Sequence, residues 1–215
     1  MALDNINLEI PKGEICCILG TSGSGKSTLL NLMAGLERPT KGNIKIKGKN
    51  IERMSENSLA KFRQRNIGFV FQSYNLLPAL TALENVSLPL IFRGVGKKAR
   101  NKRAKKLLEQ VGLGTHLKHK PNQMSGGQQQ RVGIARAFVG NPEIVFADEP
   151  TGNLDSKTTV EIMNLIIGLA RENNQTLIIV THDINIAKYA DRIVYILDGN
   201  IEKIEKTVKV EGEII

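Results

Sequence analysis

The sequence predicts an α/β fold with a mostly parallel core sheet, and three observations lead to that prediction. Four short runs, EICCILG, IGFVFQ, EIVFAD and TLIIVTHD, are apolar almost throughout, as expected for strands covered on both faces. The glycine-rich stretch GTSGSGKS follows the first run and precedes a helix-like segment. The alternating runs LDNINLEI, GNIKIKGKNI and DRIVYILDGNIEKIEK predict strands of a half-exposed antiparallel sheet.

The pattern changes in the middle of the chain. From about 73 to 123 it favours helices and loops, interrupted by Pro78, Pro89 and Pro121, with no run typical of a buried strand. A length of 215 residues suits one substantial core. We therefore expect a single domain, 1–215, in which about 1–72 and 124–215 form the α/β core and about 73–123 form an inserted helical subdomain.

Composition excludes several classes of protein. The hydrophobic share of 41% and the charged share of 24% are those of an ordinary globular protein, and no apolar stretch approaches the roughly 20 residues of a membrane helix. No basic and apolar leader follows Met1, so we expect no export. Cys16 and Cys17 are adjacent in an apolar run, which predicts reduced core residues in a cytoplasmic protein.

The formal net charge of +9 calls for an acidic partner, and much of the excess is local. Eight Lys or Arg and no Asp or Glu lie between Arg93 and Lys106. A solvated helix face is the favoured interpretation, because apolar residues recur behind the charges at helical spacing. Nucleic acid, anionic lipid and an acidic protein surface are the alternative partners.

GTSGSGKS fits the phosphate-loop pattern G-x-x-x-x-G-K-[ST], between a predicted strand and a helix expected from Lys26 to about Gly35. Its glycines allow backbone N–H groups to turn toward an anion at the helix N-terminus. Lys26 would reach the β and γ phosphates of a nucleotide, and Ser27 would bind Mg²⁺. A flexible Gly/Ser turn is the alternative. The expected nucleotide-binding residues here are Gly20, Thr21, Ser22, Gly23, Ser24, Gly25, Lys26, Ser27 and Thr28.

Polar residues end the other predicted buried strands, where parallel sheets collect ligands. EIVFADE ends in Asp148, an expected magnesium carboxylate, and Glu149, which could face an attacking water. Gln72 ends IGFVFQ, and His182 follows TLIIVT. Either one alone would be interpreted as a satisfied residue at the edge of the core. Together they could touch water, metal or the γ phosphate.

A second helix N-terminus follows in NQMSGGQQQRVGIARAF. Ser125, Gly126 and Gly127 precede an amphipathic pattern that begins near Gln128, with Ser125 as the expected N-cap. An ordinary capped helix explains this segment locally. One nucleotide needs only one phosphate-binding helix N-terminus, here called a cradle. The sequence alone therefore leaves the purpose of a second cradle open.

Taken together, these motifs resemble those of the nucleotide-binding subunits of ATP-binding cassette (ABC) transporters over almost the whole chain. GTSGSGKST matches Walker A, Gln72 the Q-loop, MSGGQ the signature, IVFADE Walker B, Asp155 in NLD the D-loop, and His182 the switch histidine, in the family's order. FVFQSYNLLPALTALENVSLPL and ADEPTGNLDSKT look especially like the branch for lipoprotein release, macrolide or antimicrobial-peptide export, and the related cell-division ATPase.

The resemblance implies an ATPase of the P-loop NTPase fold in its ABC form, which hydrolyses MgATP as a head-to-tail homodimer and powers a separate integral-membrane permease. Glu149 would be the general base, His182 would hold the γ phosphate, and Gln72 would sense Mg²⁺. The partner subunit would supply the signature to each ATP. The residues implied on that side are Ser125, Gly126, Gly127, Gln128 and Asp155. We expect a cytoplasmic protein, peripheral on the inner face of the membrane.

The sequence departs from the family pattern at two places. Met124 replaces the usual leucine of the signature, an apolar exchange of similar volume that we expect to be tolerated. The chain starts at MALDNINLEI, where the family has a further strand and an aromatic residue that stacks on adenine. We therefore expect weaker adenine binding, since such a stack contributes roughly 1–3 kcal/mol.

Two other functions carry the same motifs. An ABC ATPase head for DNA repair or chromosome organisation would use the positive charge on phosphate backbones. Such heads have a long coiled-coil insertion, whereas the interval from Gln72 to the signature is about fifty residues without sustained heptads. We therefore expect no nucleic acid partner. A cell-division ATPase, which transmits movement through a membrane partner, stays an alternative.

Overall fold

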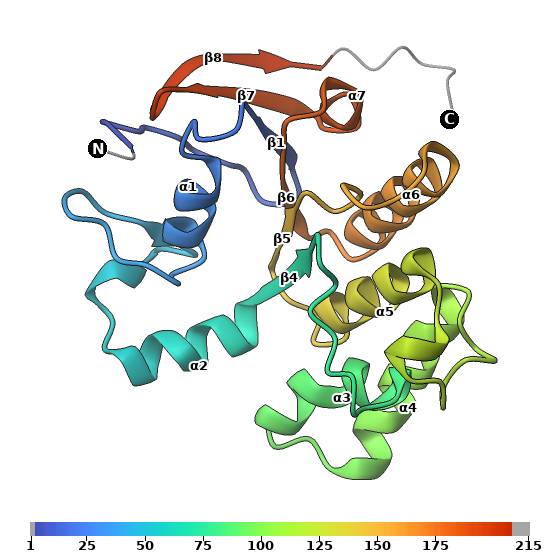
Figure 1. The fold of residues 1–215 in the computed structure, drawn as a ribbon. Helices are drawn as coiled ribbons and strands as arrows, with labels where there is room; N and C mark the ends of the chain where they lie inside the picture. Colours follow the sequence, from blue (N-terminus) through green and yellow to red (C-terminus); the bar gives the residue numbers. More distant parts are fainter. Residues whose placement is uncertain (1–2, 208–215) are drawn as a thin grey trace.

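The computed structural model describes residues 3–207 and has a six-stranded sheet at its centre, covered by helices on both faces (Figure 1). The strand order is β4-β5-β6-β1-β7-β8, and all neighbours are parallel except β7 and β8. The strands are β1 (Ile15–Leu19), β4 (Ile67–Phe71), β5 (Ile144–Asp148), β6 (Thr176–Thr181), β7 (Arg192–Leu197) and β8 (Asn200–Lys206). The prediction of four buried parallel strands and a mixed α/β fold is confirmed.

The sheet separates two apolar cores. Cys16 and Cys17 are neighbours in β1, and because strand side chains alternate they lie in different cores. Both thiols are free, and burial raises the pKa of Cys16 to about 12. Helices α1 (Lys26–Met33) and α2 (Glu56–Asn66) contribute to the core of Cys16. Helices α5 (Gly126–Phe138), α6 (Ser156–Glu172) and α7 (Ile184–Ala187) contribute to the core of Cys17.

The segment between β4 and α5 is helical, as the sequence predicted. It contains α3 (Ala82–Phe92), α4 (Lys97–Gln110) and a short 3₁₀ helix, η2 (Pro121–Gln123). Figure 1 shows α3 and α4 at the opposite end of the molecule from β7 and β8. Val86 of α3 and Leu108 of α4 belong to the same core as α5. The limits proposed for a helical subdomain, 73 and 123, stay a prediction. Within residues 3–207, no helix has the length and apolar character required to span a bilayer.

The prediction of a strand for LDNINLEI is wrong. Residues 3–10 contain no strand, and Asn5 has a left-handed φ of 49°. The alternation is nevertheless real, because Leu3, Ile6, Leu8 and Ile10 pack against the core of α1 and α2. One-sided burial therefore produced the alternating pattern without a hydrogen-bonded strand partner. The expectations that rest on Met1 lie outside the described residues.

The other two alternating runs form hairpins. β2 (Lys45–Ile46) and β3 (Lys49–Asn50) are a two-stranded antiparallel pair, joined by Lys47 and Gly48, both with positive φ. β7 and β8 are joined in the same way through Asp198 and Gly199. The sequence predicted that β7 belongs to a separate antiparallel sheet. That prediction is wrong, because β7 also pairs in parallel with β1. Its largely buried residues allow it to join the core sheet.

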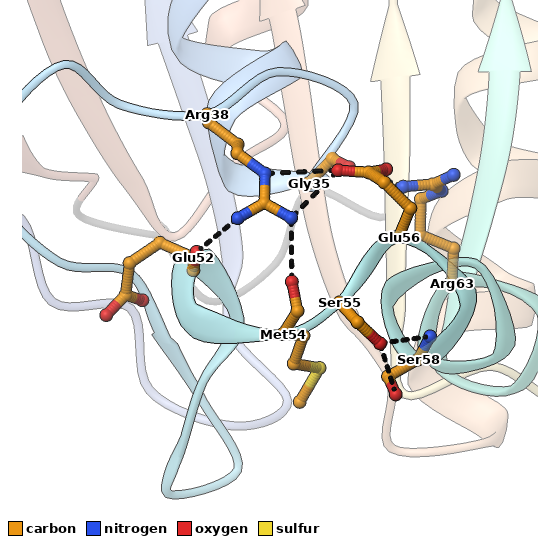
Figure 2. A network of polar contacts seen from close by, with 8 residues as sticks. All are labelled: Gly35, Arg38, Glu52, Met54, Ser55, Glu56, Ser58 and Arg63. Atoms are coloured by element: carbon orange, nitrogen blue, oxygen red, sulfur yellow. Dashed lines mark hydrogen bonds and ion pairs between the residues drawn. The ribbon is translucent and has the colours of Figure 1, made fainter.

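A polar network fixes the loop that follows α1 (Figure 2). Arg38 donates to the carbonyl of Glu52 in η1 (Ile51–Arg53) over 2.9 Å, and its Nη2 lies 2.8 Å from Glu56 Oε1 at the start of α2. Arg63, near the end of α2, donates to the carbonyl of Gly35. These contacts hold the C-terminal end of α1 against α2, so the opposite end of α1, at the phosphate loop, has a fixed support.

Candidate active site

The phosphate loop connects β1 to α1 and needs its glycines for two different reasons. Gly23 and Gly25 have φ values of 82° and 100°, in the left-handed region where a side chain is strained. Gly20 lies against the β7 backbone, and a Cβ there would lie 2.3 Å from the carbonyl oxygen of Ile196. The loop therefore requires a residue without a side chain at each of these places.

The N-terminus of α1 is open to an anion. Its N-cap, Gly25, provides no side-chain hydrogen bond, and its first turn has no acidic residue. Lys26 is buried, with 7% of its surface exposed, and its Nζ donates to the carbonyl of Thr21 over 2.7 Å. Ser24 Oγ is buried without a partner among residues 3–207. The loop therefore holds a positive charge and unoccupied donors at one point.

The remaining predicted residues of this loop lie at its surface. Ser22 and Ser27 are exposed, and Thr28 in the first turn of α1 is half-buried. The exposed hydroxyl of Ser27 is available to a ligand beside the loop.

Asp148 and Glu149 lie at the carboxyl end of β5, next to that of β6. Burial and the charge of Glu149 raise the pKa of Asp148, while Lys26 opposes the shift. A half-buried carboxylate with a raised pKa favours a further cation nearby. Glu149 itself has a left-handed φ of 43°, and its N–H donates to the carbonyl of Val180 in β6. This backbone contact turns the Glu149 side chain toward the end of β6.

Three donors from the end of β6 surround the Glu149 carboxylate. Thr181 Oγ1 donates to Oε2 over 2.9 Å, and the backbone N–H of His182 donates to Oε1 over 3.1 Å. His182 Nδ1 lies 2.7 Å from the same oxygen and must be the donor, because an ionised carboxylate only accepts. The Glu149 side chain is 19% exposed and that of His182 is 69% exposed. The sequence indicated the pair but missed Thr181, which its place directly before His182 could have revealed.

Gln72 follows β4 and contacts the segment after Glu149. Its Nε2 lies 3.4 Å from Asn153 Oδ1, and Asn153 Nδ2 donates to the Gln72 carbonyl over 3.1 Å. Just beyond, Arg136 of α5 donates to the carbonyls of Tyr74 and Asn75, over 2.8 Å to Tyr74. The sequence missed Asn153 and Arg136. Asn153 lies between Glu149 and Asp155, which was a usable signal; Arg136 follows the signature by about three helical turns and gave none.

The predicted second cradle is the N-terminus of α5. Ser125 is the N-cap: its Oγ accepts from Gln128 N over 3.3 Å, and Gln128 Oε1 accepts from Ser125 N over 2.9 Å. Met124, which departs from the usual leucine, is buried in the apolar core.

Beside this N-terminus is a cavity of about 350 Å³. Its lining includes Ser125, Gly126, Gly127, Gln128, Asn153 and Asp155. Asp155 is the N-cap of α6, and its carboxylate accepts from Thr158 N over 3.0 Å and from Thr158 Oγ1 over 2.7 Å. These hydrogen bonds lower the pKa of Asp155. The signature segment and the predicted D-loop therefore share one cavity within a single chain.

The two cradles lie on opposite faces of the sheet. α1 packs in the core of Cys16 and α5 in the core of Cys17. Among the described residues, those lining the signature cavity come from 125–131 and 153–161, and none comes from the phosphate loop. Lys26 and Ser125 thus belong to separate sites within one subunit.

The residues near Lys26 suit a magnesium nucleotide. The open N-terminus of α1 and the buried ammonium group fit a phosphate chain. Asp148 and Ser27 offer oxygen atoms, which are the ligands of Mg²⁺ in proteins. Within residues 3–207 no group of three or more His, Cys, Asp or Glu could hold a metal ion.

Comparisons with known proteins agree with this geometry. The model of the ABC transporter family matches residues 3–152, which is most of the chain. The chain belongs to the ABC transporter family. It is an ATP-binding subunit of that family and hydrolyses ATP, so the enzyme class expected from the sequence is confirmed. The roles of the individual residues stay predictions.

Two curated relatives and one solved structure define the similarity. An uncharacterized ABC transporter ATP-binding protein of Thermotoga maritima is 55% identical over 212 residues, covering 99% of this chain and 90% of that protein. The macrolide export ATP-binding/permease protein MacB of Shewanella sp. (strain W3-18-1) is 48% identical, covering 96% of this chain and 32% of MacB. The ATP-binding cassette MJ0796 of Methanocaldococcus jannaschii, in a dimeric post-hydrolysis state bound to ADP and Pi, has a TM-score of 0.88 and 49% identity, covering 97% and 92% of the two chains.

Proposed function

We propose that two copies of this ABC subunit close head to tail around two ATP molecules and that closure drives a membrane permease from the inner face of the membrane. The observation that carries the proposal is the placement of the two cradles on opposite faces of the sheet. A second copy can bring its signature to the phosphate loop, which the signature of the same copy does not line. The dimeric state of MJ0796 supports this arrangement.

Each copy would bind the phosphates through its own loop. Lys26 would hold the β and γ phosphates, and the N–H groups from Gly20 to Thr28 would surround them. Ser27 and Asp148 would hold Mg²⁺ directly or through water, with Gln72 near its outer side. The ion, when bound, supplies neutralisation of the phosphate charge. The raised pKa of Asp148 supports its role, because a nearby cation relieves the cost of its buried charge.

Glu149 would accept a proton from the attacking water. It is held at the end of β5 by Thr181 and His182, so its position is fixed before the nucleotide arrives. His182 is mostly exposed, and in the closed dimer its free ring nitrogen would face the γ phosphate. The Nδ1 contact with Glu149 would keep the ring oriented for that purpose.

The partner copy would complete each site. The Ser125 hydroxyl and the N–H groups of Gly126, Gly127 and Gln128 would bind the γ phosphate at the N-terminus of α5. Asp155 lines the same cavity and would contact the partner near the nucleotide. Closure with ATP and opening after hydrolysis would be a shift between two dimer arrangements.

An apolar groove of about 220 Å³ offers the docking place for the permease. It lies along the edge strand β4, where Phe69 and Phe71 stack with their centroids 5.5 Å apart. Leu88 and Phe92 of α3 form the other side. Phe71 lines the groove and directly precedes Gln72 in the chain. A permease segment docked in the groove would therefore lie beside Gln72. MacB, which contains both ATP-binding and permease functions, supports a permease partner and an export role.

The test is Glu149→Gln, with Glu143→Gln as the matched control. Glu143 is a half-buried carboxylate that pairs with Lys47 over 2.6 Å outside the site. We expect Glu149→Gln to bind ATP, to lose turnover by about 10² to 10⁴-fold, and to accumulate as a dimer in light scattering. The control should match the native protein. Unchanged turnover would remove the base role of Glu149, and a monomer at every concentration with bound MgATP would refute the paired site.

A further inference from the structure

Helix α4 presents an exposed row of cations that the ATPase reaction does not use. Ala104 and Leu108 are buried in the core shared with α5, while all the basic residues of α4 except the half-buried Arg100 are exposed. Its basic residues are Lys97, Lys98, Arg100, Lys102, Arg103, Lys105 and Lys106. In the described part of the chain, the only ion pair on α4 joins Lys105 to Glu109 over 3.7 Å. Most of this charge is thus not neutralised within the subunit.

The basic residues in the first turn of α4 do not stabilise the helix. The N-terminus of a helix carries a partial positive charge and favours acidic residues. The first turn of α4 has none and contains Lys97, Lys98 and Arg100 instead. Gly96, its N-cap, provides no side-chain hydrogen bond. Because these local preferences are unmet, the basic residues are better explained by a partner outside the subunit than by helix stability.

The positive charge extends from α4 to an apolar corner. The pKa of Arg93 is lowered by burial and then by the charges of Arg103 and Arg65, so the positive charge of α4 continues to Arg93. Directly before Arg93, the end of α3 exposes Phe92 at 63% and Ile91 at 43%. Figure 1 shows α3 and α4 together at one end of the molecule. The surface therefore combines unpaired cations with exposed apolar side chains.

We infer that this surface, α4 together with Phe92 and Ile91 and here called the basic surface, binds the anionic head groups of a lipid bilayer. Lysine and arginine attract acidic lipids, while exposed aromatic and aliphatic side chains enter the boundary between head groups and acyl chains. A nucleic acid backbone would satisfy the charges but leave Phe92 and Ile91 in water.

The location agrees with this choice of partner. Phe92 also lines the groove beside β4, so the basic surface adjoins the face assigned to the permease. To this extent the inference rests on the proposed function. Binding to lipid alone needs neither a permease nor a nucleotide, and it can therefore be tested separately.

The experiment measures binding of the purified protein to vesicles of phosphatidylcholine, with and without phosphatidylglycerol, by sedimentation. The test variant is Lys98→Glu/Arg103→Glu/Lys106→Glu. The control is Lys41→Glu/Lys45→Glu/Lys49→Glu, which changes the net charge equally at exposed lysines in and next to the β2–β3 hairpin. Each basic residue near an acidic membrane strengthens binding about fivefold, so three reversals should weaken binding at least about 100-fold.

The test variant should fold normally. The acid introduced at 98 lies four residues before Lys102, the favourable order for a helical ion pair, and it suits the helix N-terminus. Basal ATPase activity should stay at the native level in both triple variants, which separates this test from failure of the proposed function. Phe92→Ser should weaken vesicle binding by about tenfold without altering the charge, because the aromatic side chain that would be buried in the bilayer is lost.

Four results would overturn the inference. These are no binding of the native protein to acidic vesicles, equal loss in test and control variants, binding that Phe92→Ser leaves unchanged, and tighter binding to a short DNA duplex than to acidic vesicles. The last result would assign the basic surface to nucleic acid.

Discussion

The two helix N-termini of the site are built differently, although both are expected to bind phosphate. α1 begins at Gly25 with no side-chain cap, and its first residue is a buried lysine. α5 begins after Ser125, whose capping box with Gln128 already satisfies the N–H groups of Ser125 and Gln128 before any ligand arrives. The first is arranged to hold an anion by itself. The second is stable without one, which suits a group that meets the phosphate only when a partner approaches.

This difference has a functional consequence. In the proposed dimer, a subunit would bind nucleotide through α1 at any time, while the contribution of α5 would depend on a second copy. We therefore expect nucleotide to bind before the two subunits pair, because α1 is uncapped and α5 is capped.

The largest expected effect comes from removing the charge at the first N-terminus. Lys26→Ala should reduce turnover by about 10² to 10³-fold, because the phosphates lose their buried cation. Steady-state phosphate release measures it. Undiminished activity would show that the loop is not the phosphate site.

Mixing two inactive variants tests whether the two cradles of one nucleotide site come from different subunits. Ser125→Glu, which places a carboxylate in the second cradle, should also be inactive on its own. In a mixed dimer of the Lys26→Ala and Ser125→Glu proteins, both changes fall in one site and the other site is native. Random pairing should restore about a quarter of the native sites. No recovery in a mixture shown to form mixed dimers would place both cradles in the same subunit's site.

A smaller effect is expected from Ser125→Ala, with Ser55→Ala as its control. Ser55 is the N-cap of α2 and accepts from Ser58 N over 3.4 Å, so both variants lose one cap. Each should lower the free energy of unfolding by about 1 kcal/mol, measured by urea denaturation. Only Ser125→Ala should also reduce turnover. Equal turnover in the two variants would leave Ser125 a structural cap.

The smallest effect concerns the stability of the nucleotide-free protein. Because the folded-state pKa of Asp148 is raised, its ionised form destabilises the fold at neutral pH, and this penalty disappears as the pH falls below its ordinary pKa. Asp148→Asn should therefore raise Tm at pH 7 and not at low pH, by calorimetry. Asp198→Asn, in an exposed turn, should leave Tm unchanged. A lower Tm at pH 7 for Asp148→Asn would contradict the account.

The fold was predictable where burial alone determines structure. Runs such as ICCIL and TLIIVT are largely apolar on both faces, and that pattern is typical of a central parallel strand. Prediction failed at LDNINLEI, because alternation reports which side chains are buried and not whether the backbone has a partner. Likewise β7 could not be assigned to the core sheet, since its pairing with β1 depends on distant residues.

The site was predictable wherever a motif requires particular residue types. Lys26, Glu149 and Ser125 could be singled out because phosphate binding, proton transfer from water and a helix N-terminus each limit the choice of side chain. The structure confirms Ser125 as an N-cap, while the roles of Lys26 and Glu149 stay predictions. Residues that act by holding others were missed. Thr181 hydrogen-bonds to Glu149, and only its place directly before His182 could have indicated it. Arg136 donates to two backbone carbonyls, a task that needs no recognisable spacing.

Arg136 shows what such a missed residue does for the molecule. It extends from α5 to the carbonyls of Tyr74 and Asn75, and the Tyr74 hydroxyl lies against Gly126 at the beginning of the same helix. These hydrogen bonds hold Tyr74 and Asn75, two non-glycine residues with positive φ, in place. The stretch after Gln72 therefore contacts α5 near both ends of that helix. We therefore expect a displacement of the loop after Gln72 to move α5 as well.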